Sequence, residues 1–314
     1  MNAVLSPHIL SSGGDGDGRV SVSLSELLAL RARVARVALP TRESRVASAG
    51  QQSSRLYGRG MDYAESRAYQ PGDDVRRLDW RLTARSGKLH TKLFQEEREG
   101  RVLVLLDTHA SMRFGTRSRF KSVQAARAAA MAAWLAVRAG ERIGAVAFGE
   151  RTHILRPQGG TRGALAFCGA LADRSAGAEG RSESLSEALL RAGRLVRSAG
   201  RVLLISDGLS CDDLARGRLL DLRRHADIGV LIVGDVLELA TAPVGRYPLE
   251  HDGVRREVVL QAERQRREFQ QALGAGQARL AALAQALGLR QRTIDTVVDP
   301  LDAVVGLLGA SGQR

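Results

Sequence analysis

The chain has 314 residues, of which 44% are hydrophobic, 26% charged and 4% aromatic. This composition is typical of a globular protein with a mostly aliphatic core, and it excludes a fibrous or an intrinsically disordered chain. The formal net charge is +13, and nearly all of the positive charge comes from arginine because the chain has only three lysines. Arginine binds carboxylates and phosphates in a forked geometry, so an anionic partner is compatible with this charge, although solvated arginine-rich helix faces explain it more simply.

Binding of nucleic acid through arginine is one alternative function, for which the sequence offers little support. The arginines are scattered along the whole chain, which has no zinc-finger spacing, RNA-recognition aromatics or basic heptad.

Cys168 and Cys211 are too few for a disulfide framework or a thiolate metal site, which fits a reducing compartment. The N-terminus lacks the order of a signal peptide, and no run approaches the roughly 18 apolar residues of a membrane span. We therefore expect a soluble cytoplasmic protein.

The first hundred residues are predicted to contain a tail, one helix and a polar segment. Residues 1–20 include SSGGDGDG, which buries too little apolar surface to order itself, and are predicted to be a disordered tail. Ser23 and Glu26 have the spacing of a capping box, and apolar residues follow at helical spacing, which predicts a helix over 23–39 that ends before Pro40. Residues 41–60 are predicted to be a connector within an N-terminal region that spans 21–100.

From residue 101 onward, strands alternate with helices. The apolar sequences RVLVLL and RVLLIS are typical of strands that are covered on both faces. Strands are predicted at 101–106, 142–148, 152–156, 201–206, 228–233 and 289–296, and helices at 118–139, 161–172, 184–198, 214–225, 260–287 and from Pro300. Prolines and a turn within 237–259 predict a small β-hairpin insertion. The pattern predicts an α/β domain over 101–308, a mostly parallel Rossmann-like sheet with helices on both faces, followed by a tail at 309–314.

Two aspartates follow predicted strands at the point where each strand ends. Asp107 ends the first strand of the domain, Ser111 lies four residues later, and Asp207 follows the strand at 201–206. Ligands of such sheets bind outside the carboxyl ends of the strands. Because carboxylates and hydroxyls are the oxygen ligands that hard divalent cations prefer, Mg²⁺ or Mn²⁺ is a possible cofactor. Alternatively, both aspartates cap the turns that follow them by accepting backbone N–H bonds.

This arrangement resembles the metal-ion-dependent adhesion site of von Willebrand factor type A domains, whose first loop reads Asp-x-Ser-x-Ser. In this chain His109 replaces the middle serine, and the second loop corresponds to 182–185, which has no threonine. Asp107, Ser111 and Asp207 match the resemblance residue by residue, and Glu183 could supply a compensating oxygen. The resemblance therefore implies a degenerate metal site.

The segment at 69–80 carries a second resemblance. It reads YQPGDDVRRLDW and is followed by Thr83-Ala-Arg85, Gly87-Lys88, Phe94 and Glu97-Arg98. This signature is similar to that of the bacterial family named domain of unknown function fifty-eight, and the resemblance extends over roughly 25–308. It implies an N-terminal signature region joined to a von Willebrand factor type A-like domain, and partnership with a MoxR-type AAA+ ATPase in maturing or assembling other proteins. Many relatives carry two membrane helices, which this chain lacks.

The signature region has a physical interpretation beside the family name. Its acidic and basic residues alternate, which predicts an internal ion-pair network in a sheet-poor segment; they are Asp73, Asp74, Asp79, Glu96 and Glu97 with Arg76, Arg77, Arg81, Arg85 and Arg98. The alternative is a partner-binding surface with Trp80 as its anchor beside Arg76 and Arg77, because Trp and Arg concentrate binding energy at interfaces.

These observations predict a non-enzymatic protein-interaction module that engages an ATPase or an unknown protein client through the face that carries Asp107 and Asp207. A metal-assisted hydrolase is the alternative from another class, with His109 as general base beside a metal-bound water. The sequence has no nucleophile elbow, phosphate loop or further ligand cluster that would favour catalysis. We therefore expect no enzymatic activity.

Overall fold

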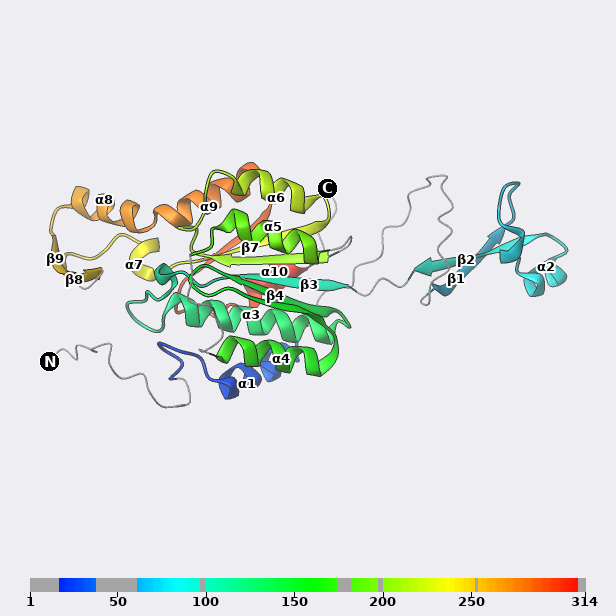
Figure 1. Ribbon diagram of the computed structural model, residues 1–314, viewed down its shortest axis with the longest axis horizontal. Coiled ribbons are helices and arrows are strands. Elements are labelled where there is room, and N and C mark those ends of the chain that lie inside the picture. The colour runs from blue at the N-terminus through cyan, green and yellow to red at the C-terminus, as the bar shows by residue number, and fades with distance from the viewer. Residues whose placement is uncertain are drawn as a thin grey trace. The chain divides into compact units, whose positions relative to one another are not determined.

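The computed structural model describes residues 17–37, 61–96, 100–173, 182–196, 200–251 and 254–309 (Figure 1). The chain forms two compact units: the larger contains Met1–Arg42 and Gly100–Arg314, and the smaller contains Glu43–Glu99. Residues 1–16 of the predicted tail, the predicted connector at 41–60 and residues 310–314 lie outside the described residues. Residues 17–20 differ from the predicted disorder, because the Asp17 carboxylate accepts backbone N–H bonds from residues 19, 20 and 21.

The larger unit is built on a six-stranded sheet with the order β10-β7-β6-β3-β4-β5. Its strands are β3 (Arg101–Asp107), β4 (Arg142–Phe148), β5 (His153–Gln158), β6 (Gly200–Ser206), β7 (Ala226–Val233) and β10 (Arg290–Ile294). All neighbours pair in parallel except β5, which follows β4 in the chain and pairs antiparallel with it. Every residue of β6 is buried, as expected for a strand with helices on both faces. The predicted fold class is confirmed.

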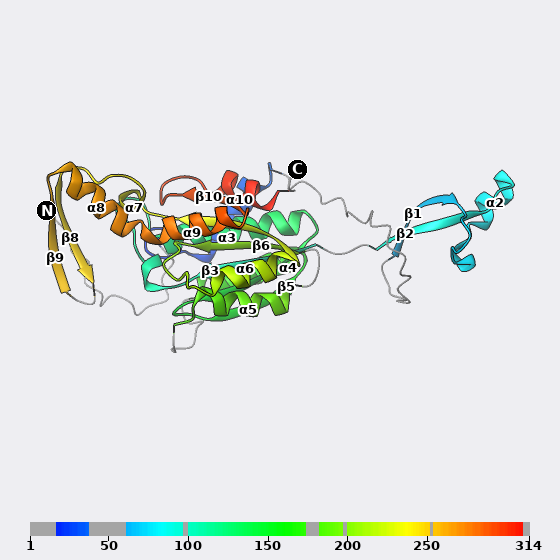
Figure 2. The ribbon, with the colours of Figure 1, turned by 90° about the horizontal axis from the view of Figure 1, so that it is seen from above.

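Helices cover the two faces of this sheet (Figures 1 and 2). One face packs against α1 (Leu24–Val34), α3 (Lys121–Arg138), α4 (Gly160–Ala172) and α10 (Leu301–Leu308). The other packs against α5 (Leu185–Leu195), α6 (Ala215–Arg223) and α9 (Ala275–Ala286). Most residues of α3 are buried, and its many alanines let the sheet, α1 and α4 approach it closely.

The first helix belongs to the larger unit, which corrects the predicted grouping of 21–100 as one N-terminal region. α1 packs against α3 and α4, and the indole N–H of Trp134 donates to the carbonyl of Leu27 at 3.1 Å. The helix ends at Val34, earlier than predicted. Arg138 explains this end, because its guanidinium donates to the carbonyls of Val34 and Val37 at 2.8 Å.

A helical and hairpin segment is inserted between β7 and α9. It contains α7 (Val236–Leu239), β8 (Gly245–His251), β9 (Val254–Leu260) and α8 (Glu263–Leu273), so the predicted hairpin insertion is present. The single long helix predicted over 260–287 is wrong, because the chain forms α8 and α9 with Gly274 between them. A Cβ at Gly274 would lie 2.8 Å from the carbonyl oxygen of Glu238, so the absence of a side chain at this glycine lets α7 approach closely.

The smaller unit is not the sheet-poor segment that the sequence predicted. β1 (Met61–Ala68) pairs antiparallel with β2 (His90–Glu96), and a 3₁₀ helix η1 (Val75–Arg77) and α2 (Trp80–Ser86) lie between them in the chain. One of the predicted acidic residues, Asp73, forms an ion pair at 2.7 Å, but its partner is Arg67, which the predicted network did not include. Asp79 has a different role: it caps α2 by accepting from the backbone N–H of Leu82 at 3.0 Å.

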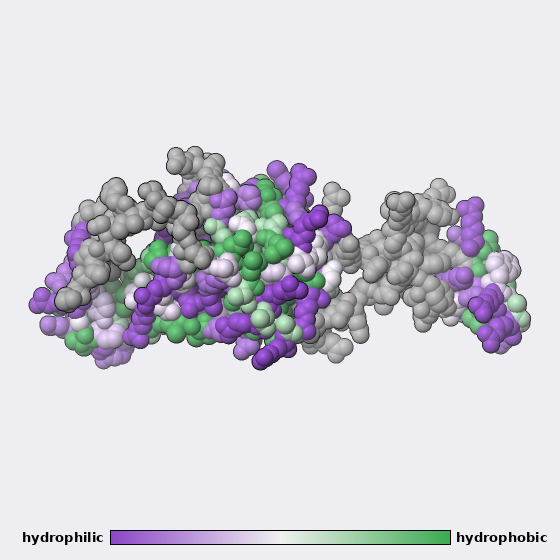
Figure 3. Space-filling model, turned by 90° about the horizontal axis from the view of Figure 1, so that it is seen from below, coloured by the Kyte–Doolittle hydropathy of each residue, from purple (hydrophilic) through white to green (hydrophobic). Residues whose placement is uncertain are grey.

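The surface mixes hydrophilic and apolar residues. On the face seen from below, apolar residues lie among hydrophilic ones over the central part of the larger unit (Figure 3). Within the described ranges, no helix combines the length and the apolar character that crossing a membrane requires.

A substitution in the sheet core tests this packing. Leu105 in β3 is fully buried, so we expect Leu105→Ala to lower the free energy of unfolding by about 2–5 kcal/mol, through lost burial and the cavity left behind. Leu214→Ala, at an exposed position, is the matched control and should change it by less than about 0.5 kcal/mol. Urea denaturation followed by circular dichroism measures both, and equal losses would contradict the described core.

Candidate functional site

The two predicted aspartates lie at the same edge of the sheet. β3 pairs in parallel with β6, and Leu106 is in register with Ile205, so Asp107 lies one residue and Asp207 two residues beyond this pair, at the same end of the two strands. The chain leaves β3 toward β4 on one side and leaves β6 toward β7 on the other. This reversal of strand order is the topological switch point, where doubly wound sheets form their ligand crevice. We call this region, with the loops that follow β3, β6, β7 and β10, the carboxyl edge.

Asp107 is buried and its carboxylate is occupied by donors from its own chain. One oxygen, Oδ1, accepts from the backbone N–H of His109 at 3.0 Å and from its Nδ1 at 2.6 Å. The other, Oδ2, accepts from the hydroxyls of Ser206 at 2.6 Å and Ser210 at 2.9 Å. Asp107 therefore joins the loop after β3 to the loop after β6. Sequence reasoning missed both serines, although Ser206 directly precedes Asp207 and Ser210 lies three residues after it.

His109 is held against Asp107 and Phe148. The hydrogen bond from its ring to the Asp107 carboxylate raises the pKa of His109 against the opposing effect of burial, and the Asp207 and Glu150 carboxylates add to the rise. The imidazole packs edge-on against the Phe148 ring, with 5.9 Å between ring centroids. Gly149 makes room for it, because a Cβ there would lie 2.7 Å from His109 Nδ1, and its φ of 110° favours glycine.

Asp207 is paired with a buried lysine that the sequence analysis did not single out. Lys121, the first residue of α3, is 0% exposed, and its Nζ lies 2.9 Å from Asp207 Oδ2 and 2.7 Å from Glu238 Oε1. Glu238 also accepts from the side chain of Gln277 at 2.9 Å and from the backbone N–H of Asp235 at 2.7 Å. Burial raises the pKa of Glu238, and the Lys121 ammonium opposes this rise. The feature of the sequence that could have drawn attention to Lys121 is that it is one of three lysines in an arginine-rich chain.

Asp235 extends this polar network to two further loops. Its carboxylate accepts from the Thr116 hydroxyl at 2.5 Å, the Thr116 backbone N–H at 3.0 Å and the Thr296 hydroxyl at 3.0 Å. Burial raises the pKa of Asp235, but these hydrogen bonds and one from the backbone N–H of Leu237 together outweigh it, so the pKa is lowered. The loops after β3, β7 and β10 are thereby fixed to one another.

The other predicted ligands are arranged differently. The Ser111 hydroxyl, in the 3₁₀ helix η2 (Ala110–Met112), is buried and has no hydrogen-bond partner among the described residues. Glu183 forms an ion pair with Arg191, and burial raises the pKa of its carboxyl group. Ser184, in the stretch that the resemblance matched to the second loop, caps α5 in a capping box with Glu187. Neither Glu183 nor Ser184 is therefore free to act as a ligand.

These residues do not fit a divalent cation in the arrangement observed. Ser111 offers one open oxygen, but both oxygens of Asp107 accept hydrogen bonds and Asp207 contacts an ammonium group. The part of the chain that the structure describes contains no group of three or more His, Cys, Asp or Glu residues placed to hold a metal ion. A bound Mg²⁺ or Mn²⁺ stays a prediction, and the chemistry of this donor set is unfavourable to it.

The predicted partner-binding residues lie in the smaller unit. Trp80, at the start of α2, is 67% exposed, and Arg76 in η1 is exposed as well. The backbone of Arg77 also belongs to η1, but its side chain is outside the described part of the structure. A large exposed indole is compatible with an interface anchor. Partner binding at these three residues stays a prediction.

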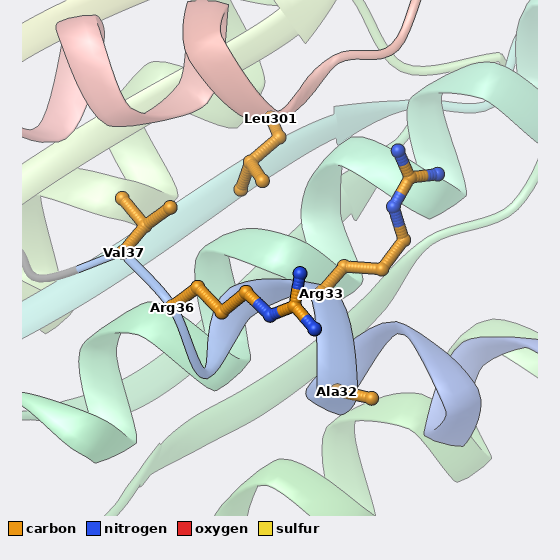
Figure 4. A pocket seen from close by; sticks show the side chains of 5 residues that line it. All are labelled: Ala32, Arg33, Arg36, Val37 and Leu301. Carbon is orange, nitrogen blue, oxygen red and sulfur yellow. The ribbon is translucent and has the colours of Figure 1, made fainter.

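Two hollows lie in the larger unit. One, of about 310 Å³, is mostly apolar and is lined by Asp107, His109, Met112, Val123 and Phe167 among others. The other, of about 500 Å³, lies between α1 and the start of α10 and is lined by Ala32, Arg33, Arg36, Val37 and Leu301 (Figure 4). The second hollow contains neither aspartate, so it is separate from the carboxyl edge.

The His109 pair predicts a dependence of stability on pH. Folding raises the pKa of His109 above its ordinary value of 6.5. The pairing of His109 with Asp107 therefore stabilises the fold fully below pH 6.5, and this stabilisation is lost as the pH rises through the pKa of His109 in the folded state. We expect the wild type to be more stable than His109→Gln below about pH 6, with the difference shrinking toward about pH 9. Denaturant titrations across this range measure it. The exposed His153→Gln serves as control, and a difference that stays constant with pH would refute the His109–Asp107 pairing.

Comparison with known proteins identifies the family. The family described as "Protein of unknown function DUF58" matches residues 65–279. "Uncharacterized protein Mb1516" from Mycobacterium bovis is 30% identical over 260 residues, which cover 82% of this chain and 81% of the relative. Among solved structures, the conserved hypothetical protein BatB from Bacteroides thetaiotaomicron has a TM-score of 0.41 and 16% identity, covering 66% of this chain and 96% of that chain. The SpRpn10 VWA domain has a TM-score of 0.37 and 10% identity, covering 69% and 100%. The chain belongs to the DUF58 family.

Proposed function

We propose that this protein is a protein-interaction module that works with a MoxR-type AAA+ ATPase in the assembly or maturation of other proteins. The proposed docking surface is the carboxyl edge of the six-stranded sheet. Membership of the DUF58 family supports an interaction role, and the identity of the ATPase partner rests on the signature at 69–80. This location is supported by a set of exposed apolar side chains on loops whose backbone is held by hydrogen bonds to aspartates.

The apolar side chains come from two loops of the carboxyl edge. Leu209 and Leu214 follow β6, Val297 and Val298 follow β10, and all four are between 46% and 67% exposed. Because β6 and β10 belong to the parallel part of the sheet, both loops leave it at the same edge. Exposed apolar groups at one edge of a sheet are compatible with a surface that binds another protein.

Aspartate carboxylates fix the backbone beneath these side chains. Asp207 accepts from the backbone N–H of Leu209 at 3.1 Å. Asp295 accepts from the backbone N–H groups of Val297 at 2.8 Å and Val298 at 2.7 Å. A surface that is rigid before binding loses less conformational entropy when a partner docks. The aspartates of the carboxyl edge therefore support a docking role by holding its loops.

One observation favours a second candidate, a hydrolase. The Asp107 carboxylate orients the His109 imidazole at 2.6 Å, as a carboxylate orients the general base of many hydrolases. The raised pKa of His109 opposes this role, because it favours the protonated imidazole over the neutral form that accepts a proton. Turnover of a phosphatase or esterase substrate that is lost in His109→Ala and retained in His153→Ala would support the hydrolase.

Arginine-driven binding of nucleic acid would show an affinity that falls steeply with added salt.

The docking proposal predicts the effect of charge at the apolar loops. We expect Leu209→Asp combined with Leu214→Asp to weaken binding of a MoxR-type ATPase at least about tenfold, because each carboxylate would have to be desolvated in the interface. Binding is measured by biolayer interferometry with the full chain. Asp107→Ala is a poorer probe, because Asp107 accepts four hydrogen bonds and its removal would disturb the loops themselves.

The matched control is Leu165→Asp, which places the same charge on an exposed leucine of α4. This variant should bind the ATPase as the wild type does. Full affinity in the double variant, with an unchanged melting temperature, would show that the ATPase does not dock at the carboxyl edge.

A further inference from the structure

A buried ammonium group lies among the carboxylates of the carboxyl edge. Lys121 is fully buried, and a buried lysine is rare unless it is paired, because removing an ammonium ion from water costs several kcal/mol. Its Nζ contacts Asp207 at 2.9 Å and Glu238 at 2.7 Å, and it lies 5.6 Å from the centroid of the Phe114 ring. These contacts supply the oxygen ligands and the negative charge that a small cation would need.

Both aspartates of the predicted metal site have a basic side chain as their partner. Asp207 and Glu238 share Lys121, and their remaining oxygens accept from the backbone N–H of Leu209 and from the side chain of Gln277. Asp107, the other acidic group of the predicted metal site, is paired with His109. A divalent cation that used Asp207 would lie close to an ammonium ion that is itself buried, where like charges repel strongly. A cation could bind there only after Lys121 moved.

We infer that Lys121 takes the place of the divalent cation at this edge, so that the protein neither binds Mg²⁺ or Mn²⁺ there nor needs either ion for folding or docking. This inference does not depend on which partner binds the edge. It follows that removing the ammonium should create a cation site: Lys121→Ala leaves two carboxylates, Asp207 and Glu238, facing a vacated volume, and carboxylate oxygens with water suit Mn²⁺.

Thermal unfolding of the full chain with MnCl₂, MgCl₂ or EDTA tests the inference. We expect the melting temperature of the wild type to change by less than about 1 °C at millimolar metal, because a ligand shifts it only by binding the folded form. Lys121→Ala should melt lower than the wild type without metal and should be raised by about 3 °C or more by saturating Mn²⁺. Lys88→Ala, which removes an exposed lysine of the smaller unit, is the control and should behave as the wild type.

A saturable rise in the wild-type melting temperature with Mn²⁺ that disappears in Ser111→Ala would overturn the inference. A Lys121→Ala protein that folds but does not respond to Mn²⁺ would also count against it, because Asp207 and Glu238 would then not form the vacated cation site.

Acetylation of the wild type gives a second test that needs no folded variant. With N-hydroxysuccinimide acetate followed by peptide mass spectrometry, the exposed Lys88 should react readily, and the buried Lys121 should react at least about tenfold more slowly. Added Mn²⁺ should leave the rate at Lys121 unchanged. If Mn²⁺ bound Asp207 it would displace the ammonium, and faster acetylation of Lys121 in the presence of Mn²⁺ would contradict our proposal.

Discussion

The ion pairs of Lys121 with Asp207 and Glu238 hold together the part of the molecule where its loops converge. They join the start of α3, the end of β6 and α7, three elements that are far apart in the sequence. Asp235 continues the same network to the loops after β3 and β10. A buried charge that loses its partner destabilises a protein strongly, so these groups depend on one another. The exposed leucines and valines of the edge rest on this buried framework.

Two glycine contacts allow the loops to come this close. Gly208, with φ of 80°, lies against α9, where an added Cβ would be 2.2 Å from the carbonyl oxygen of Gly276. A Cβ added to Gly276 would in turn lie 2.7 Å from the carbonyl oxygen of Asp207. The loop that carries Asp207 is thus pressed against the first turn of α9 without any intervening side chain. The same proximity places Gln277 within reach of Glu238.

The fold could be predicted from the sequence further than the site could. Strands such as β3 and β6 are local apolar runs, and the two aspartates that end them can be located from the same pattern. The partners of those aspartates could not, because Lys121 is 86 residues from Asp207 and 117 from Glu238, and only the folded chain brings them together. The hairpin of the smaller unit was missed for a related reason. Its strands carry charged residues and gain their order from pairing with each other, so their sequences lack an apolar run.

The departures from the adhesion-site pattern are explained together by this charge arrangement. In the pattern, hydroxyls from the first and second loops surround a cation. Here the middle serine is replaced by His109, whose raised pKa favours a positively charged imidazole beside Asp107, and the Lys121 ammonium lies beside Asp207. With a basic side chain in contact with each of these carboxylates, a ligand from the second loop has no cation to bind. That loop is then free for structural roles, and Ser184 caps α5 while Glu183 pairs with Arg191. The aspartates keep the positions that resemble a metal site, but their contacts are those of residues that fix loops.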